Sequence, residues 1–228
     1  GGGGCAPATN DEQWRQMKTY YRRCVQSGIC VAPRGFQDSW DMHFHHEALC
    51  MYDRLIENIL AFHDADPDRV YLLGFSAGGD GVYRLAPMMA DRWAAANMSA
   101  GHPGGVRPQN LYHVPFLIQC GENDDSYNRA EEAISYGKKL CELRAEQRHV
   151  EQPVGYTSET WIHVGRPHNI IDNDRRGIRQ NVLHDLAVNG SNTASSTCTM
   201  RNTSAVSWVS MFTREPVPKH VIWDVNTR

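Results

Sequence analysis

The chain has 228 residues, 41% of them hydrophobic, and a formal net charge of −3 at pH 7. That length predicts a single α/β domain over residues 1–228, because two large domains would need a longer chain. The slight negative charge gives no electrostatic basis for binding nucleic acid. The apolar runs are far shorter than a membrane-crossing helix requires, so we expect no membrane span.

The cysteines and the first residues bear on the cellular setting. The seven cysteines are an odd number without close paired spacing. Cys30 and Cys120 lie in strand-like runs and Cys50 on a helical face, where thiols act as small hydrophobic side chains. We therefore expect reduced cysteines and a cytoplasmic location. The chain opens with four glycines instead of methionine, which predicts a fragment whose true N-terminus and any targeting segment are missing.

The N-terminal part predicts two helices separated by a strand and a loop. Asn10 is a candidate cap for a helix whose apolar residues recur up to Val25. Residues 28–33, Gly-Ile-Cys-Val-Ala-Pro, predict a strand that the proline ends. A polar loop over 35–46 follows, and a second helix is expected over 47–63, with one apolar face.

The loop over 35–46 raises the question of a metal. It holds three histidines and two aspartates. Neither HExxH nor paired-cysteine spacing is present, so we expect no metal. A loop that borders the substrate site is the better interpretation, and Trp40 is its candidate substrate contact.

The most informative stretch is 69–79, where a strand-like run ends in Gly-Phe-Ser-Ala-Gly-Gly. The run is rich in branched and aromatic residues, as buried parallel strands are, and residues 81–86 predict a helix. Gly-x-Ser-x-Gly between a strand and a helix is typical of a nucleophile elbow, a tight turn that exposes the serine oxygen. Ser76 is therefore the candidate nucleophile. The alternative is a chance match in a glycine-rich turn.

The second half of the chain predicts more strands that end in polar loops. Strands are expected at 93–100, 114–120 and 160–164, and a helix at 129–146. The stretch 187–204 is small and polar without periodicity, so we expect an irregular loop or insertion there. A short helix and a strand are expected within 206–225. The alternation of strands and helices predicts a parallel sheet covered by helices on both faces.

The chemistry-bearing residues lie just past the ends of these strands, where ligands gather in α/β folds. Ser76 comes first, acidic residues of 121–125 follow, and His168 comes last. Serine, acid and histidine in this order are typical of α/β-hydrolases. The histidine would remove the serine proton, the acid would orient the imidazole, and backbone amides would hold the oxyanion.

The motifs Asp-Pro-Asp-Arg-Val-Tyr at 66–71 and Gly-Phe-Ser-Ala-Gly-Gly at 74–79 carry a family resemblance. They resemble the polyhydroxybutyrate-depolymerase-like and carboxylesterase groups of the α/β-hydrolase superfamily, over roughly 1–168. The resemblance implies a serine esterase that acts on a small-molecule or lipid-like carboxylic ester and needs no cofactor. The superfamily also includes peptidases, acyltransferases and non-catalytic binding modules, which remain alternatives.

The opening glycines resemble a His-Gly-Gly-Gly oxyanion loop without its histidine. This resemblance implies that the N–H groups of Gly2 or Gly3, together with that of Ala77, stabilise the oxyanion. It also implies that the central strand of the sheet precedes residue 1. If so, the strands at 28–33 and 69–74 should stand roughly 9–10 Å apart, twice the usual strand spacing. The alternative is a direct ladder between them.

Several residues compete for the acid and the base. Asp124 matches the family's Gly-x-x-Asp pattern, while Asp125 and Glu122 remain alternatives. For the base, we expect His168, four residues past a strand end. His163 falls inside a strand and is expected to be a packed core residue.

Two further histidines have other expected positions. His184 falls in a helical stretch. His102 follows a different strand and is a candidate substrate contact. Nothing in the sequence indicates an oligomeric state.

Overall fold

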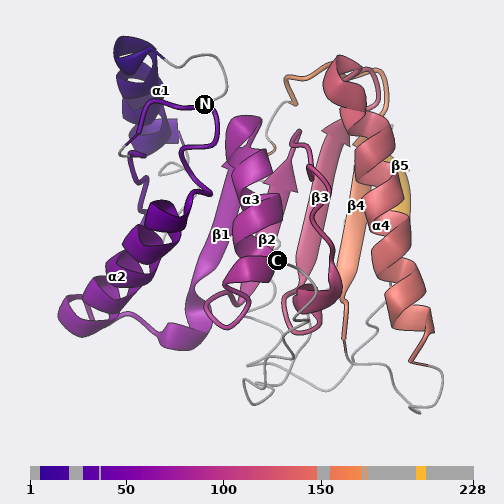
Figure 1. Ribbon diagram of the computed structural model, residues 1–228. Helices are drawn as coiled ribbons and strands as arrows, with labels where there is room; N and C mark the ends of the chain where they lie inside the picture. Colours follow the sequence, from indigo (N-terminus) through magenta and orange to yellow (C-terminus); the bar gives the residue numbers. More distant parts are fainter. Residues whose placement is uncertain are drawn as a thin grey trace.

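The computed structural model describes residues 6–20, 28–35, 37–147, 155–170, 173 and 199–203. The strands in this part of the chain form one sheet in the order β1-β2-β3-β4-β5, with every neighbouring pair parallel (Figure 1). Strand order follows sequence order, so all carboxyl ends lie at one edge. Their bounds are β1 (Tyr71–Phe75), β2 (Ala95–Ser99), β3 (Phe116–Gly121), β4 (Ser158–His163) and β5 (Thr199–Thr203). The predicted parallel α/β architecture is confirmed.

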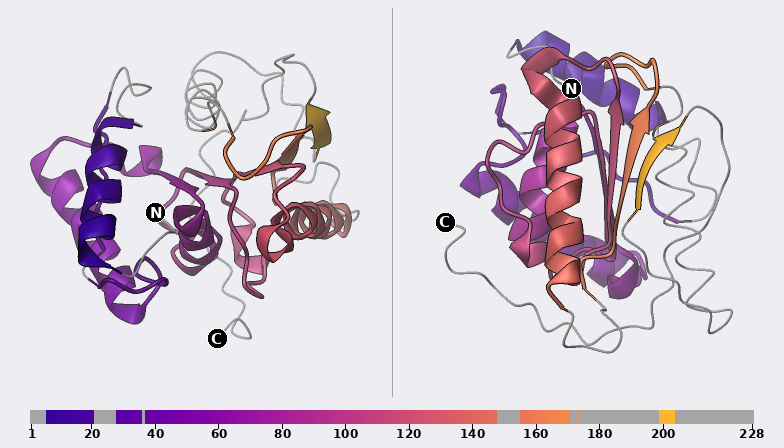
Figure 2. Two further views of the ribbon diagram at one scale, coloured as in Figure 1. Left: turned by 90° about the horizontal axis from the view of Figure 1, so that it is seen from above. Right: turned by 90° about the vertical axis from the view of Figure 1, so that its right-hand side faces the viewer.

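The described helices lie on one side of this sheet. Helix α3 packs on β1 and β2, and α4 packs on β3 and β4, against the same face (Figures 1 and 2). Helices α1 and α2 lie beyond β1. The bounds are α1 (Pro7–Tyr20), α2 (His46–Phe62), α3 (Ala77–Met88) and α4 (Arg129–Ala145), with short 3-10 turns at Pro67–Arg69, Gln109–Leu111 and Ser126–Asn128. No described helix covers the opposite face, where a second layer was predicted.

The hydrophobic core fills the space between the sheet and α3 and α4. Side chains alternate along a strand, so every second residue of β2 and β3 points toward the helices. The ring of Tyr83 lies 5.8 Å from Phe116 and 4.7 Å from Tyr136, and all three side chains are buried. Burying each large apolar side chain stabilises the fold by roughly 2–3 kcal/mol. This packing holds α3, and hence the turn before it, firmly on the sheet.

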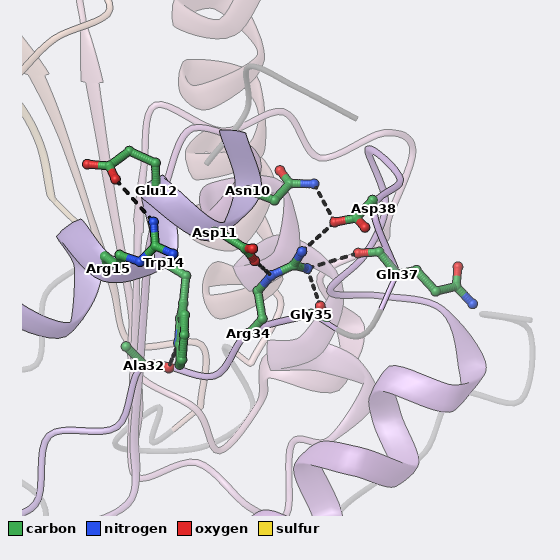
Figure 3. A network of polar contacts seen from close by, with 10 residues as sticks. All are labelled: Asn10, Asp11, Glu12, Trp14, Arg15, Ala32, Arg34, Gly35, Gln37 and Asp38. Atoms are coloured by element: carbon green, nitrogen blue, oxygen red, sulfur yellow. Dashed lines mark hydrogen bonds and ion pairs between the residues drawn. The ribbon is translucent and has the colours of Figure 1, made fainter. Parts of the chain in front are cut away.

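Residues 28–33 do not form the expected strand. Ile29 and Val31 are exposed, at 50% and 45%. The indole of Trp14 on α1 donates a hydrogen bond to the carbonyl of Ala32 at 2.7 Å (Figure 3). The prediction was wrong because strand-like composition does not supply a paired neighbour, and here the backbone lies beside α1.

Residues 28–33 show neither of the two arrangements that were expected between them and β1, a wide gap or a direct ladder. Within the described part of the chain, β1 pairs only with β2. No ladder joins Val31 to Tyr71, and there is no second strand from which a wider spacing could be measured.

Asn10 does not cap α1, which begins three residues earlier at Pro7. Its side-chain amide instead donates to Asp38 at 3.0 Å. Arg34 bonds both Asp11 of α1 and Asp38, so this cluster ties α1 to the loop that begins at residue 37 (Figure 3). The hydrogen bonds from Asn10 and Arg34 lower the pKa of Asp38. The part of the expected helix over 21–25 lies outside the described residues.

Strand β5 lies inside the stretch 187–204, which was expected to be irregular. Residues 199–203, Thr-Met-Arg-Asn-Thr, pair in parallel with β4. The prediction was wrong for this segment because a short edge strand without apolar alternation leaves no periodic signal. Residues 187–198 and the elements expected within 206–225 lie outside the described residues.

Cys141 on α4 is disulfide-bonded. Cys50 and Cys120 are free thiols, as expected. The expectation of reduced cysteines is therefore wrong for Cys141, and the expected cytoplasmic location loses the support it drew from that expectation.

The helices that the structure describes are short or polar compared with a membrane span. None of them is both long enough and apolar enough to cross a bilayer.

Candidate active site

Ser76 occupies a strained turn between β1 and α3. Its backbone angles are φ 58° and ψ −121°, a conformation that residues other than glycine rarely adopt. Two hydrogen bonds hold it: its N–H donates to the carbonyl of Ser99 at 3.0 Å, and its carbonyl accepts from Asp80 at 3.0 Å. The strand–turn–helix context predicted for the motif is therefore present.

Asp124 lies in the turn that follows β3. Its N–H donates to the carbonyl of Gly121, and the residue is only 2% exposed. Its neighbour Asp125 is exposed. Glu122 is also exposed and accepts a hydrogen bond from the N–H of Gly165 at 2.7 Å. Of the three acids, only Asp124 points inward.

His168 lies in the loop after β4 and bridges the other two residues. Its Nδ1 lies 2.7 Å from Oδ2 of Asp124, and its Nε2 lies 2.9 Å from Oγ of Ser76. The ring also lies 5.2 Å from that of Phe75. The prediction that Ser76, Asp124 and His168 converge at one sheet edge is confirmed, and we call them the candidate triad. With Nδ1–H donating to the carboxylate, Nε2 can accept the serine proton.

A second cluster contains the same three residue types, serine, histidine and aspartate, but has a different geometry. In the loop before α2, His45 lies 3.2 Å from Ser39 and 2.7 Å from Asp41. Both contacts are made by the same nitrogen, Nε2. One nitrogen cannot donate to a carboxylate and accept a serine proton at once, so this cluster lacks the bridging arrangement of the candidate triad.

The loop before α2 was also the candidate metal-binding segment. Its His43 contacts the hydroxyl of Tyr52 at 2.6 Å, and burial lowers the pKa of His43 to about 4. Among the described residues, no group of three or more histidines, cysteines, aspartates and glutamates could hold a metal ion.

Ala77 is the first residue of α3, so its N–H has no partner inside the helix. The positive end of the helix dipole lies at the same point, which favours a developing oxyanion. Both features fit the expected role of Ala77. The other two expected donors, Gly2 and Gly3, lie outside the described residues.

The loop that carries His102 is fastened to α3. The N–H of His102 donates to Asp80 at 2.7 Å, and its Nδ1 accepts from the N–H of Gly104 at 2.9 Å. Asp80 is buried, and this burial raises its pKa. His102 is thus held near the start of α3, but no described contact joins it to the candidate triad.

Trp40 belongs to the loop before α2 and is 42% exposed. Arg84 of α3 links this loop to the one that carries His102. Its guanidinium lies 5.1 Å from the ring of Phe44 and donates to the carbonyl of Gly104 at 3.1 Å. The two loops expected to contact substrate therefore meet on α3. A substrate contact by Trp40 or His102 remains a prediction.

A buried polar network on the opposite sheet face was not predicted. The amide of Gln119 donates to Asn97 and to the carbonyl of Asn173, both at 3.0 Å, and its oxygen lies 3.1 Å from Nε2 of His163. His163 is thus a packed core residue, as expected, whereas His184 lies outside the described residues. The network connects β2, β3 and β4 to the chain beyond His168. Its only sequence signal is polar residues at alternate strand positions.

No known protein-family model matches this chain, and no curated protein matches it. A function for the site therefore has to be supported by its geometry and chemistry.

Proposed function

We propose that this chain is a serine hydrolase of the α/β-hydrolase type that cleaves a carboxylic ester through an acyl-enzyme. The observation that carries the proposal is the bridge made by His168, which contacts Asp124 with Nδ1 and Ser76 with Nε2. Each nitrogen has one task, as base-assisted attack by serine requires. The strained turn at Ser76 and the helix that starts at Ala77 add to this support.

The proposed reaction begins when Oγ of Ser76 attacks the ester carbonyl carbon while His168 takes the serine proton. The carbonyl oxygen becomes an oxyanion that the N–H of Ala77 stabilises. The tetrahedral adduct then breaks its bond to the alkoxy oxygen. That oxygen takes the proton from His168 and leaves as the alcohol.

Deacylation repeats these steps with water. His168 removes a proton from the water, which attacks the acyl carbon of the acyl-enzyme. Collapse of the second adduct returns the proton to Ser76 and releases the carboxylic acid. Asp124 stays an anion throughout and stabilises the imidazolium that forms twice in the cycle.

The test is labelling with a fluorophosphonate probe, followed by identification of the modified residue by mass spectrometry. We expect the label on Ser76. The variant Ser76→Ala should take no label and should lose p-nitrophenyl ester hydrolysis by about 10⁴-fold or more. Ser39→Ala is the matched control, because Ser39 also contacts a histidine. This variant should keep both the label on Ser76 and the hydrolysis of p-nitrophenyl esters. Labelling elsewhere, or an active Ser76→Ala, would refute the proposal.

The same assay separates the neighbouring reaction types. Hydrolysis of short p-nitrophenyl esters without cleavage of peptide p-nitroanilides supports an esterase. Preferential amide cleavage indicates a peptidase, and transfer to an added alcohol in preference to water indicates an acyltransferase. These types share the triad chemistry and differ in the groups that the pocket accepts.

A further inference from the structure

Arg129 is a buried cation beside the acid of the candidate triad. It is the first residue of α4 and is 4% exposed. Its Nη1 lies 3.4 Å from Oδ1 of Asp124 and donates to the carbonyl of Ser126 at 3.3 Å. The guanidinium also stacks over the ring of Tyr127, with its central carbon 4.9 Å from the ring centroid.

The two oxygens of the Asp124 carboxylate are divided between two partners. Oδ2 faces His168 at 2.7 Å, and Oδ1 faces Arg129 at 3.4 Å. Contacts at both oxygens restrict rotation of the carboxylate about its Cβ–Cγ bond. The oxygen that serves His168 is thereby kept in place.

The backbone before Arg129 is bent in an unusual way. Tyr127 and Asn128 both have positive φ values, 59° and 54°. Such angles cost of order 1–3 kcal/mol each and persist only where surrounding contacts enforce them. The bend lets the side chain of Arg129 return to Asp124 across only five positions of sequence.

The position of Arg129 on its helix points the same way. A cation at the first position of a helix is disfavoured by the helix dipole, which prefers negative charge there. Glu131 and Glu132 in the same turn follow that preference, and Arg129 does not. The pairing of Arg129 with a nearly inaccessible carboxylate, whose side chain is 1% exposed, accounts for the exception.

The other titratable groups near this pair come from three further elements. Cys120 of β3 has its sulfur 3.9 Å from Oδ2 of Asp124, and burial raises the pKa of this thiol to about 12, which keeps it neutral. Asp80 of α3 is close enough for the charge of Arg129 to oppose the rise in its pKa that burial causes. His168 completes the set. Arg129 is therefore the permanent cation among two carboxyl groups, a thiol and an imidazole.

We propose that Arg129 is a positioning residue of the triad, which holds the carboxylate of Asp124 with Oδ2 turned toward His168. A carboxylate held in this way keeps the imidazole proton on Nδ1 and leaves Nε2 free to accept the proton of Ser76. The inference rests on the proposed function. It assigns Arg129 no contact with substrate, because its effect passes through Asp124.

The experiment compares Arg129→Met and Arg129→Lys in the full chain, each with and without Asp124→Asn. Arg15→Met, on the exposed surface of α1, is the matched control and should behave as wild type. The kcat and KM of ester hydrolysis are measured, and fluorophosphonate labelling rates are measured in parallel. Arg129→Met should lower kcat by about tenfold or more with KM little changed, because the carboxylate no longer holds the imidazole in place. Arg129→Lys should restore most of the rate.

The double variant shows whether Arg129 acts through Asp124. In the Asp124→Asn background, Arg129→Met should change the labelling rate by less than about twofold, because the interaction has already been removed. If Arg129→Met lowers the labelling rate equally in the wild-type and Asp124→Asn backgrounds, the inference is overturned. A folded Arg129→Met variant with the kcat of the wild type would also overturn it.

Two further outcomes are also decisive. If Arg129→Met does not fold, the double variant, which no longer contains an unpaired buried charge, is compared with Asp124→Asn alone. Equal labelling rates in these two variants support the inference. A labelling rate that is a further tenfold lower in the double variant overturns it. If the wild type itself takes no label at Ser76, the proposed function fails. If the wild type is labelled and Arg129→Met is labelled equally fast, only the inference about Arg129 fails.

Discussion

Gly74 lies directly against the carbonyl oxygen of Gly78, so that a Cβ atom added at Gly74 would overlap that oxygen. The contact joins the end of β1 to the first turn of α3, on either side of Ser76. Gly79 is similarly confined, because a Cβ there would lie 2.6 Å from the carbonyl oxygen of Ser99. A Cβ at Gly78, in contrast, meets no described atom within 4 Å. The glycines of the Gly-x-Ser-x-Gly-Gly motif are thus not equivalent.

These contacts predict opposite results for two alanine substitutions. Gly74→Ala should destabilise the protein by about 3 kcal/mol or more, because β1 or α3 must move to remove the overlap. Gly78→Ala should fold and should label normally at Ser76. Urea unfolding monitored by tryptophan fluorescence measures the free energy of unfolding of both variants. Equal stability of the two variants would show that the turn is looser than the contact between Gly74 and Gly78 indicates.

Neighbouring aspartates should respond very differently to loss of charge. Asp124→Asn leaves an amide facing Nδ1 of His168, which removes the charge that stabilises the imidazolium and disfavours the useful tautomer. We expect kcat/KM for an ester to fall by about 10³–10⁴-fold. Asp125→Asn, on the exposed side of the same turn, should stay within about twofold of wild type. A larger loss of kcat/KM in Asp125→Asn would show that Asp124 is wrongly assigned as the acid.

His43 should make the protein less stable in mild acid. Its pKa is about 4 in the folded state against an ordinary value of 6.5, so the unfolded chain binds the proton more tightly. The stability that a neutral His43 contributes is full above pH 6.5 and is lost as the pH falls toward 4. The expected loss between pH 7 and pH 4.5 is roughly 2–3 kcal/mol.

The variant His43→Asn isolates this effect. Its free energy of unfolding should depend less on pH than that of the wild type, by the same roughly 2–3 kcal/mol over this range. Asp80, whose pKa is raised by burial, contributes with the opposite sign, but it is present in both proteins and cancels in the comparison. His63→Asn, at an exposed position after α2, is the control and should follow the wild type. Parallel pH curves for wild type and His43→Asn would contradict the prediction.

Gln119 should matter for stability although it lies away from the candidate triad. Gln119→Leu removes the hydrogen bonds to Asn97, Asn173 and His163 from a buried site. Each buried polar group that loses its partner costs about 1–3 kcal/mol, so we expect a total loss of at least about 2 kcal/mol in urea unfolding. Gln16→Leu, on an exposed turn of α1, should change stability by less than about 0.5 kcal/mol. A loss that small in Gln119→Leu would mean that the network is dispensable.

Local patterns were enough to predict much of this protein. The strands at 93–100, 114–120 and 160–164 and the helices at 47–63 and 129–146 were predicted with bounds close to those observed. Helical and strand periodicity depend on neighbouring residues, and so does the turn at Ser76, which needs small residues on both sides. The order of serine, acid and histidine at strand ends follows from the same patterns. These signals lie within short stretches of the chain, so a single sequence is enough to recognise them.

Long-range pairing decided the rest. Residues 28–33 have strand-like composition yet lie beside α1, because a strand exists only where a neighbour accepts its hydrogen bonds. The short, polar strand β5 forms because β4 offers that neighbour. Asp124 and Asp125 are the same residue type one position apart, and only the fold of their turn sends Asp124 inward to His168. The cation beside it, Arg129, could be recognised only once α4 had brought it back to that carboxylate, because sequence spacing carries no information on where a buried charge finds its partner.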